Sequence, residues 1–175
     1  SLDPDELANI ADAFPDEVIN KVREELTLPK KEQFRAVMSY PANSVGAHMD
    51  FEVIKIRDEV SLEVVHRYLR RFKKLPPHTN KLFVVNKKEI LIGSLSLENL
   101  LIKDPDTLVK DSMETDILVL SVLDNAEEVA KAFERYDLVS APVVDKSLSL
   151  VGRLTVAEIV DVIRAVSYTH LTLPT

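Results

Sequence analysis

Residues 141–160, with the sequence APVVDKSLSLVGRLTVAEIV, have a near copy earlier in the chain. Residues 82–101 read LFVVNKKEILIGSLSLENLL, and the two segments align without a gap, so that Gly93 falls on Gly152. A repeat of this length indicates a fold built from two similar units. The architecture of the chain therefore follows from what one copy predicts.

Each copy predicts a strand, a turn, a second strand and a helix. A short run of apolar and β-branched residues precedes a polar turn and a second apolar segment. The glycine in each second segment indicates that another backbone approaches closely there. Ser96 and Thr155 then occupy the N-cap position of a helix. Glu158 completes a Ser/Thr-x-x-Glu capping box, which Asn99 completes only weakly.

The similarity between the two halves extends upstream of each copy. Segments 45–56 and 109–120 align with Met49 on Met113, and a helical pattern follows each segment. The complete unit is therefore predicted as strand–helix–strand–strand–helix. It occurs twice, at residues 42–104 and 105–166.

The two ends of the chain differ from this repeat. Residues 1–41 predict short helices that begin near prolines. Residues 167–175 break the preceding helical pattern, and we interpret them as a cloning remnant on a fragment of a longer protein. The predicted fold is α/β (α+β), with a short all-helical segment before two β-α-β-β-α units. The first unit carries extra residues at 73–80.

The composition excludes several classes of function. The 175 residues include 29 Asp and Glu, 22 Lys and Arg and no cysteine, which gives a net charge of −7 and argues against a nucleic-acid partner. No apolar run reaches the roughly 18 residues that a membrane span needs. The isolated residues His48, His66 and His78 share no metal-binding spacing, and no catalytic motif is present, so we predict that the chain is not an enzyme.

The repeat resembles the CBS domain, which works in tandem pairs. Two further segments, YPANSVGAHM at 40–49 and NAEEVAKAFERYDL at 125–138, resemble the MgtE family of magnesium channels. The resemblance implies that 1–41 is the end of a helical N domain, followed by the two CBS domains. It also implies a homodimer at the cytoplasmic face of the cell membrane, within a multi-pass protein whose transmembrane pore domain belongs to the same chain.

The same resemblance implies that Mg²⁺ binds between the helical segment and the CBS pair and at the dimer interface. Bound metal compacts the domain and favours the closed pore. The acidic ligands of the family fall on these residues: Asp5 or its neighbour Glu6, Glu127, Asp137, Glu158 and Asp161. One departure is that Ala157 and Glu158 stand where the family carries two aspartates, so one carboxylate is lost.

The residues themselves support this chemistry in part. Mg²⁺ prefers carboxylate and water oxygens. Glu158 and Asp161 lie three residues apart and share a helix face, and Asp137 ends a helix, where the dipole disfavours a carboxylate without a nearby cation. Each acid also has a simpler interpretation, because first-turn, capping and solvent-exposed carboxylates are common.

The sequence is also compatible with a second class of ligand, the adenine nucleotides. CBS pairs resemble adenine-nucleotide binders, in which a Ser/Thr-x-x-Asp motif holds the ribose. Thr155 and Ser96 begin imperfect versions of that motif, and Arg153 lies close by in sequence. The alternative function is therefore a CBS module that senses ATP or another adenine nucleotide and regulates an enzyme or another transporter.

Overall fold

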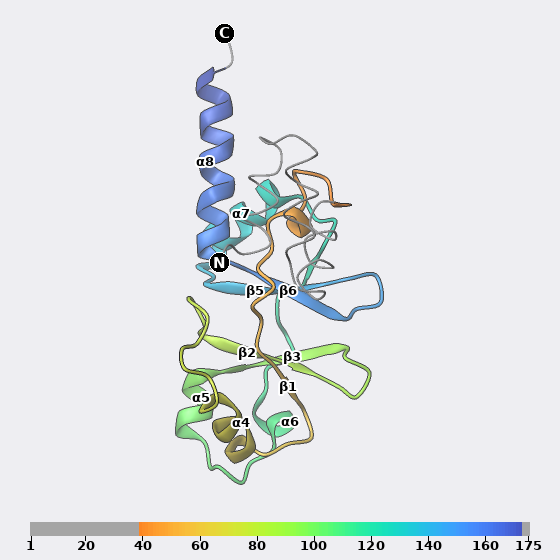
Figure 1. Cartoon of the computed structure of the whole chain (residues 1–175), viewed down its shortest axis with the longest axis vertical. Helices are drawn as coiled ribbons and strands as arrows, with labels where there is room; N and C mark the ends of the chain where they lie inside the picture. Colours follow the sequence, from red (N-terminus) through yellow and green to blue (C-terminus); the bar gives the residue numbers. More distant parts are fainter. Residues whose placement is uncertain (1–38, 173–175) are drawn as a thin grey trace, which may run out of the picture.

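The structure, a computed structural model, describes residues 39–172, with side chains through residue 166. The helices predicted before residue 39 lie outside the described residues. Within the described part, two similar halves are stacked along the long axis of the molecule (Figure 1). Each half holds a three-stranded sheet and its helices, as the repeat predicts.

The strands of the two halves pair in the same way. In the first half, β1 (Lys55–Arg57), β2 (Lys81–Val85) and β3 (Leu91–Ser96) lie in the order β1-β2-β3. In the second half, β4 (Leu120–Ser121), β5 (Ser140–Val144) and β6 (Leu150–Thr155) lie in the order β4-β5-β6. The first pair in each sheet is parallel and the second antiparallel.

The pairing register confirms the sequence alignment. Gly93 lies opposite Val84 in the first sheet, and Gly152 lies opposite Val143 in the second. Each antiparallel pair has a register shift immediately after this point. The two halves therefore share a backbone plan down to single residues.

Several of the helices begin at a side chain that caps the first turn. The described helical elements are η1 (Val45–Ala47), α4 (Leu62–Leu69), α5 (Leu97–Ile102), α6 (Val109–Ser112), α7 (Ala126–Tyr136) and α8 (Val156–Thr172). The Ser61 hydroxyl accepts the Val64 N–H at the start of α4, at 3.3 Å. The Asn125 side chain accepts the Glu128 N–H at the start of α7, at 3.0 Å. These bonds satisfy donors that a helix start otherwise leaves free.

The sheets face each other at the middle of the molecule, and α4, α5, α7 and α8 lie toward its outer ends (Figure 1). Strand β2 explains this layering because both of its faces are apolar. Leu82 and Val84 pack against the helices of the first half, whereas Phe83 and Val85 join Leu150 between the two sheets. Alternating side chains point to opposite faces of a strand, so a continuous apolar run suits a sheet that is covered on both sides.

A short segment of each half packs into the core of the other half. Val45 and Met49 are buried in the core of the second half, and Val109 is buried in the core of the first. The predicted boundaries between the units stay predictions. The packing shows that neither half's core is built from one continuous stretch of chain.

The two repeat glycines explain how closely these segments approach strands β3 and β6. A Cβ on Gly93 would lie 2.6 Å from the carbonyl oxygen of Glu114, and one on Gly152 would lie 2.9 Å from that of Asp50. Such distances leave no room for a side chain. The close backbone approach that the sequence predicts at both glycines is confirmed.

Helix α8 is longer than the sequence pattern indicates. It begins at Val156 and ends at Thr172, so the backbone remains helical six residues past the expected end of the repeat at 166. The interpretation of 167–175 as a cloning remnant stays a prediction. Across residues 39–172, no helix combines the length and the apolar character that crossing a bilayer requires.

Candidate functional site

A network of buried polar contacts lies where the two halves meet, around Arg153 on β6. The Arg153 side chain is only 4% exposed and forms an ion pair with Asp50, with 3.0 Å between the guanidinium and a carboxylate oxygen. The same guanidinium donates to the carbonyl oxygen of Pro77 at 2.7 Å and to that of His78 at 3.3 Å. A buried charge is tolerated when it is paired and hydrogen-bonded in this way.

The two carbonyl oxygens that Arg153 contacts lie in the extra segment of the first half, residues 73–80. A second bond holds the end of this segment, because the buried hydroxyl of Ser140 donates to the Asn80 side chain at 3.0 Å. His78 adopts a left-handed backbone conformation with φ of 60°. The segment that breaks the repeat symmetry is therefore fixed to the second half.

This arrangement changes the interpretation of Arg153. The sequence suggests it as a nucleotide ligand, but the structure engages its donors with Asp50 and the loop. A role in nucleotide binding stays a prediction, and it would require the side chain to give up some of these bonds. Sequence reasoning missed Asp50, although the repeat alignment places an acid at both 50 and 114 and so offered a signal.

The equivalent place in the first half has no such ion pair. Ser94 stands where the second half has Arg153, and its backbone exchanges hydrogen bonds with Glu114 at 2.9 and 2.8 Å. The neighbouring Lys81 is half-buried, and this burial lowers the pKa of its amine, although the charge of Glu114 acts in the opposite direction. The hydrogen bonds between Ser94 and Glu114 at this place are those of the backbone.

The junction of β6 and α8 forms the predicted capping box. The Thr155 N–H donates to the Glu158 carboxylate at 3.1 Å, and the Thr155 hydroxyl also donates to that carboxylate. Burial raises the pKa of Glu158, and these hydrogen bonds offset part of the rise. Glu158 is therefore held in a helix cap, and its role as a metal ligand stays a prediction.

The corresponding junction in the first half is simpler. The Ser96 hydroxyl accepts the Asn99 N–H at 3.0 Å and so caps α5. Asn99 stands where the second half carries Glu158, so a carboxylate is missing at this helix start.

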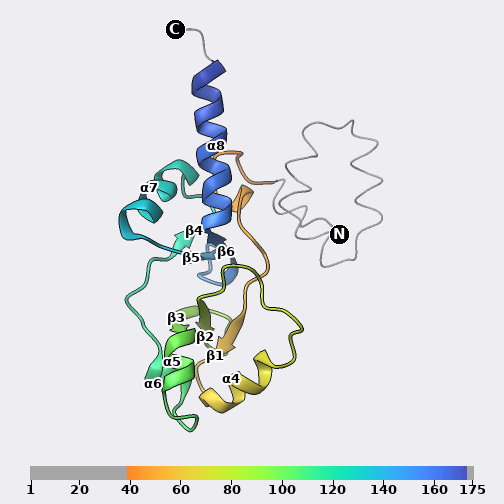
Figure 2. The ribbon, with the colours of Figure 1, turned by 90° about the vertical axis from the view of Figure 1, so that its left-hand side faces the viewer.

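The acids Glu127, Asp137 and Asp161 are exposed to solvent. Glu127 lies in the first turn of α7 and lines a cavity of about 400 Å³ together with His48 and Asn125. Asp161 lies on α8, which packs beside α7 (Figure 2). With Glu158 in the first turn of α8 and Asp137 directly after α7, the four predicted ligands among the described residues lie on or next to these two helices.

Asp137 ends α7 in a left-handed conformation with φ of 52°, and its N–H donates to the Phe133 carbonyl oxygen. Aspartate is one of the few non-glycine residues that tolerate this conformation. The backbone thus gives a structural reason for an aspartate here, in addition to the metal that the sequence predicts.

The metal site as a whole stays a prediction. Among residues 39–172, no three histidine, aspartate or glutamate side chains gather as a group that could hold a metal ion. Asp5 and Glu6, the predicted ligands from the helical segment, lie outside the described residues. The predicted ligands that the structure describes are the exposed carboxylates of Glu127, Asp137 and Asp161 and the partly buried carboxylate of Glu158.

The chain resembles known proteins in both sequence and fold. The family model for the CBS domain matches residues 109–165. The magnesium transporter MgtE of Bacillus subtilis (strain 168) is 30% identical over 162 residues, which cover 93% of this chain and 36% of that protein. The magnesium transporter MgtE of Thermus thermophilus is 33% identical over 76% of this chain and 30% of that protein.

Solved structures agree with these matches. The cytosolic domain of the Mg²⁺ channel MgtE, solved in complex with ATP, superposes with a TM-score of 0.85 at 30% identity. The match covers 92% of this chain and 66% of that one. A CBS pair domain of a magnesium transporter homologue from Shewanella oneidensis, at 20% identity and a TM-score of 0.76, supports the fold alone.

Two stacked β-α-β-β-α units that exchange their first segments define a tandem CBS domain pair. The matches to proteins named MgtE, which extend over most of the chain, identify the family as well as the fold: the chain belongs to the MgtE family. It spans about a third of the length of the curated relatives that it matches.

Proposed function

We propose that the chain is a magnesium-sensing regulatory domain of an MgtE-type transporter. The observation that carries the proposal is the match to magnesium transporters named MgtE over 93% and 76% of the chain. Mg²⁺ binds between the helical segment and the second half and across a homodimer. Binding compacts the domain and favours the closed state of a pore in the same chain.

The charge of the second half supports this proposal. Residues 105–166 contain twelve Asp and Glu against six Lys and Arg. Exposed carboxylates that are brought together repel one another, and a divalent cation relieves that repulsion. We place Glu127, Asp137 and Asp161 nearest to the metal, with Asp5 or Glu6 completing the coordination from the helical segment.

The connection between the helical segment and the repeats is shorter than the sequence suggests. The composition of residues 40–46 predicts a loop that joins the two parts, but Ser44, Val45 and Gly46 are buried in the second half. Residues 41–43, directly before this anchor, are exposed. Any movement of the helical segment relative to the repeats therefore turns at or before Asn43.

The proposed homodimer has a structural basis in exposed apolar side chains. Leu101 on α5 is 73% exposed and its neighbour Ile102 is 71% exposed, while Val160 and Ile163 on α8 are 43% and 46% exposed. Leu101 and Val160 occupy the same position in the repeat. An apolar surface that recurs on the outer helices of both halves suits a symmetric partner.

The test of the magnesium proposal is limited proteolysis between residues 39 and 43. Mg²⁺ should slow cleavage, and NaCl at matched ionic strength should not, because site binding stabilises the compact state by mass action whereas screening does not. Equal protection by both salts would refute the proposal.

Substitutions locate the site within the second half. Asp137→Asn should remove the protection by Mg²⁺ more completely than Glu128→Gln. Glu128 is a suitable control because it is a first-turn acid of α7 whose carboxylate already pairs with Lys131 at 3.3 Å. The reverse order would show that the metal lies elsewhere.

Binding of an adenine nucleotide is a second candidate function. The observation that favours it is the MgtE relative solved with ATP, which is 30% identical. Ser96 and Thr155 are the predicted ribose contacts at the two helix starts. Isothermal titration with ATP in the absence of divalent cations tests this function, and the Ser96→Ala and Thr155→Ala variants assign it to one junction.

A further inference from the structure

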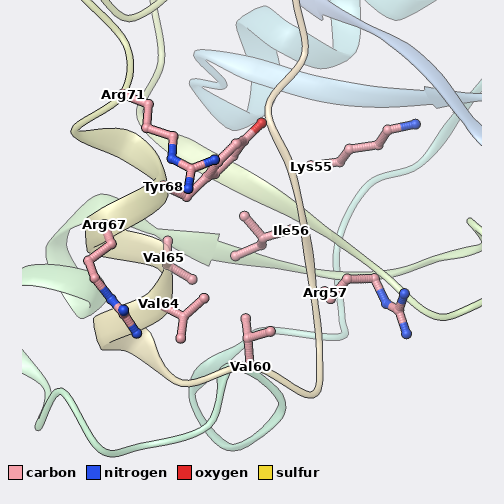
Figure 3. A pocket seen from close by; sticks show the side chains of 9 residues that line it. All are labelled: Lys55, Ile56, Arg57, Val60, Val64, Val65, Arg67, Tyr68 and Arg71. Carbon is pink, nitrogen blue, oxygen red and sulfur yellow. The ribbon is translucent and has the colours of Figure 1, made fainter.

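A separate cavity lies in the first half, between the edge strand β1 and helix α4. Its volume is about 420 Å³, which is within the range of small-molecule sites. Figure 3 shows its lining side chains, which come from these two elements and the turn between them. None of the predicted metal or nucleotide residues lines it.

The floor of the cavity is aliphatic. Ile56 and Val65 are almost fully buried, at 6% and 1% exposure, and they belong to the core of the first half. Val60 and Val64 complete the floor, and Val64 is 36% exposed. Exposed aliphatic surface inside a concave site favours a ligand that has an apolar body.

One face of α4 borders the cavity with polar groups. Val64, Arg67 and Tyr68 are spaced so that they lie along one side of this helix, and Arg71 follows in the turn directly after it. In Figure 3, Arg67 projects from the helix and Arg71 from this turn, both on the helix side of the aliphatic centre. Two guanidinium groups placed one turn apart suit a carboxylate or phosphate head group.

The basic residues of β1 contribute little charge to the cavity. Ile56 points to the core, so Lys55 and Arg57 point to the opposite face of the strand. Figure 3 shows their charged ends directed away from the aliphatic centre. Lys55 also pairs with Glu89 at 2.9 Å, and Arg57 pairs with Glu59 at 3.6 Å.

Arg67 of α4 and Arg71, in the turn after it, remain accessible to a ligand. Arg67 lies 3.9 Å from the carboxylate of Glu63, with both side chains more than half exposed. Such a pair contributes little and exchanges readily with a competing anion. Arg71 has no ion pair or side-chain hydrogen bond among the residues that the structure describes. Its charge is therefore uncompensated next to an apolar floor.

We propose that this cavity binds a small organic anion with an apolar body. The body, a single ring or a short alkyl chain, packs on Val60, Val64 and Ile56. The head group, a carboxylate or a phosphate monoester, lies between Arg67 and Arg71. The proposal does not rest on magnesium binding, because none of its residues is a predicted metal ligand.

The test is a titration of the ¹⁵N-labelled chain with phenyl phosphate and with benzoate, followed by amide chemical shifts without divalent cations. Saturable shifts should appear on β1 and on α4 from Val64 to Arg71. Inorganic phosphate has the anionic group but no apolar body, and benzyl alcohol has the ring but no charge. Each should bind at least tenfold more weakly. The stronger of the two aromatic anions identifies the head group.

Two variants and a control complete the test. Arg71→Gln should weaken binding about tenfold through loss of a charge-assisted bond, and Val64→Asp should weaken it similarly by placing a negative charge in the floor. Both positions are exposed, so the fold should survive. Arg70→Gln, an equal loss of charge at an exposed residue outside the cavity, should change binding less than twofold.

Three results would each overturn the proposal. The first is an absence of saturable shifts at millimolar probe, or shifts that lie instead at the starts of α5 and α8. The second is equal binding of inorganic phosphate and phenyl phosphate, which would indicate general attraction to basic charge. The third is an equal effect of the Arg70 and Arg71 variants.

Discussion

The two halves of the molecule share one backbone plan and carry opposite charge. Residues 42–104 contain eleven Lys and Arg against eight Asp and Glu, whereas residues 105–166 contain six against twelve. The strand pairing, the register shifts and the positions of the closely approached glycines are nevertheless the same. Backbone geometry therefore constrains the buried positions of this repeat, and the surface is left free to specialise for ligands of opposite sign.

The halves also differ in how each is fixed to the other. At both places two backbone hydrogen bonds join the segments, between Asp50 and Arg153 and between Ser94 and Glu114. The second half adds the buried ion pair between Arg153 and Asp50, with further bonds to residues 77 and 78. The comparison predicts that equivalent substitutions in the two halves will have unequal effects.

The largest difference in stability between equivalent variants is expected at Asp50 and Glu114, the acids at the same position of the two repeats. Asp50→Asn leaves the Arg153 guanidinium buried without its counter-charge, and removing one partner of a buried ion pair typically costs about 3–5 kcal/mol. Glu114→Gln, at the equivalent exposed position, should cost less than about 1 kcal/mol. Urea unfolding of both variants measures the difference. Similar losses would show that the ion pair does not fasten the halves.

The repeat glycines provide a finer comparison. A Cβ at Gly93 would lie 2.6 Å from a carbonyl oxygen, and a Cβ at Gly152 would lie 2.9 Å from its own. Gly93→Ala should therefore destabilise more than Gly152→Ala, both within the roughly 1–3 kcal/mol that overpacking costs. The unfolding midpoints of the two variants provide the measurement. The opposite order would mean that the segment near Asp50 is the more rigid of the two.

Much of the fold could be predicted because it depends on local patterns. The alignment of Val84 with Val143 predicts the strands, and the capping residues Ser96 and Thr155 predict where two of the helices begin. The glycines even indicate close contacts, although not with which segment. These features follow from residues that are near one another in sequence.

The features that were not predicted depend on contacts between distant residues. The partner of Arg153 lies 103 residues away in the sequence, and no local pattern indicates that Asp50 is buried beside it. The burial of Val45 in the second half likewise comes from an exchange between the units. For the metal ligands, exposure of Glu127, Asp137 and Asp161 is compatible with binding but does not test it.

A smaller effect is expected at the contact between Ser140 and Asn80. Ser140→Ala removes a hydroxyl that donates across the halves at 3.0 Å, and such a bond contributes about 0.5–1.5 kcal/mol. Because Asn80 is exposed, its side chain can turn to water, so the loss should lie at the low end. Amide hydrogen exchange in residues 73–80 should increase at the same time. Unchanged exchange would show that Arg153 alone holds the loop.

The smallest effect concerns Glu158 and its counterpart Asn99, and it depends on pH. Burial raises the pKa of Glu158 in the folded chain, so the folded state binds its proton more tightly than the unfolded state does. The resulting contribution to stability is complete below the unfolded pKa, and it is lost as pH rises through the folded pKa. At neutral pH the buried charge is therefore a cost that Asn99 does not impose on the first half.

Glu158→Gln should consequently match the original chain in stability near about pH 4 and exceed it near about pH 7. Glutamine retains an oxygen that can accept the Thr155 N–H, so the cap itself is preserved. The measurement is the difference in unfolding free energy between the two chains across this range. Glu98→Gln, an exposed first-turn acid of α5, controls for the loss of a helix-start carboxylate. A variant that is less stable at neutral pH would show that the charged capping box outweighs the cost of burial.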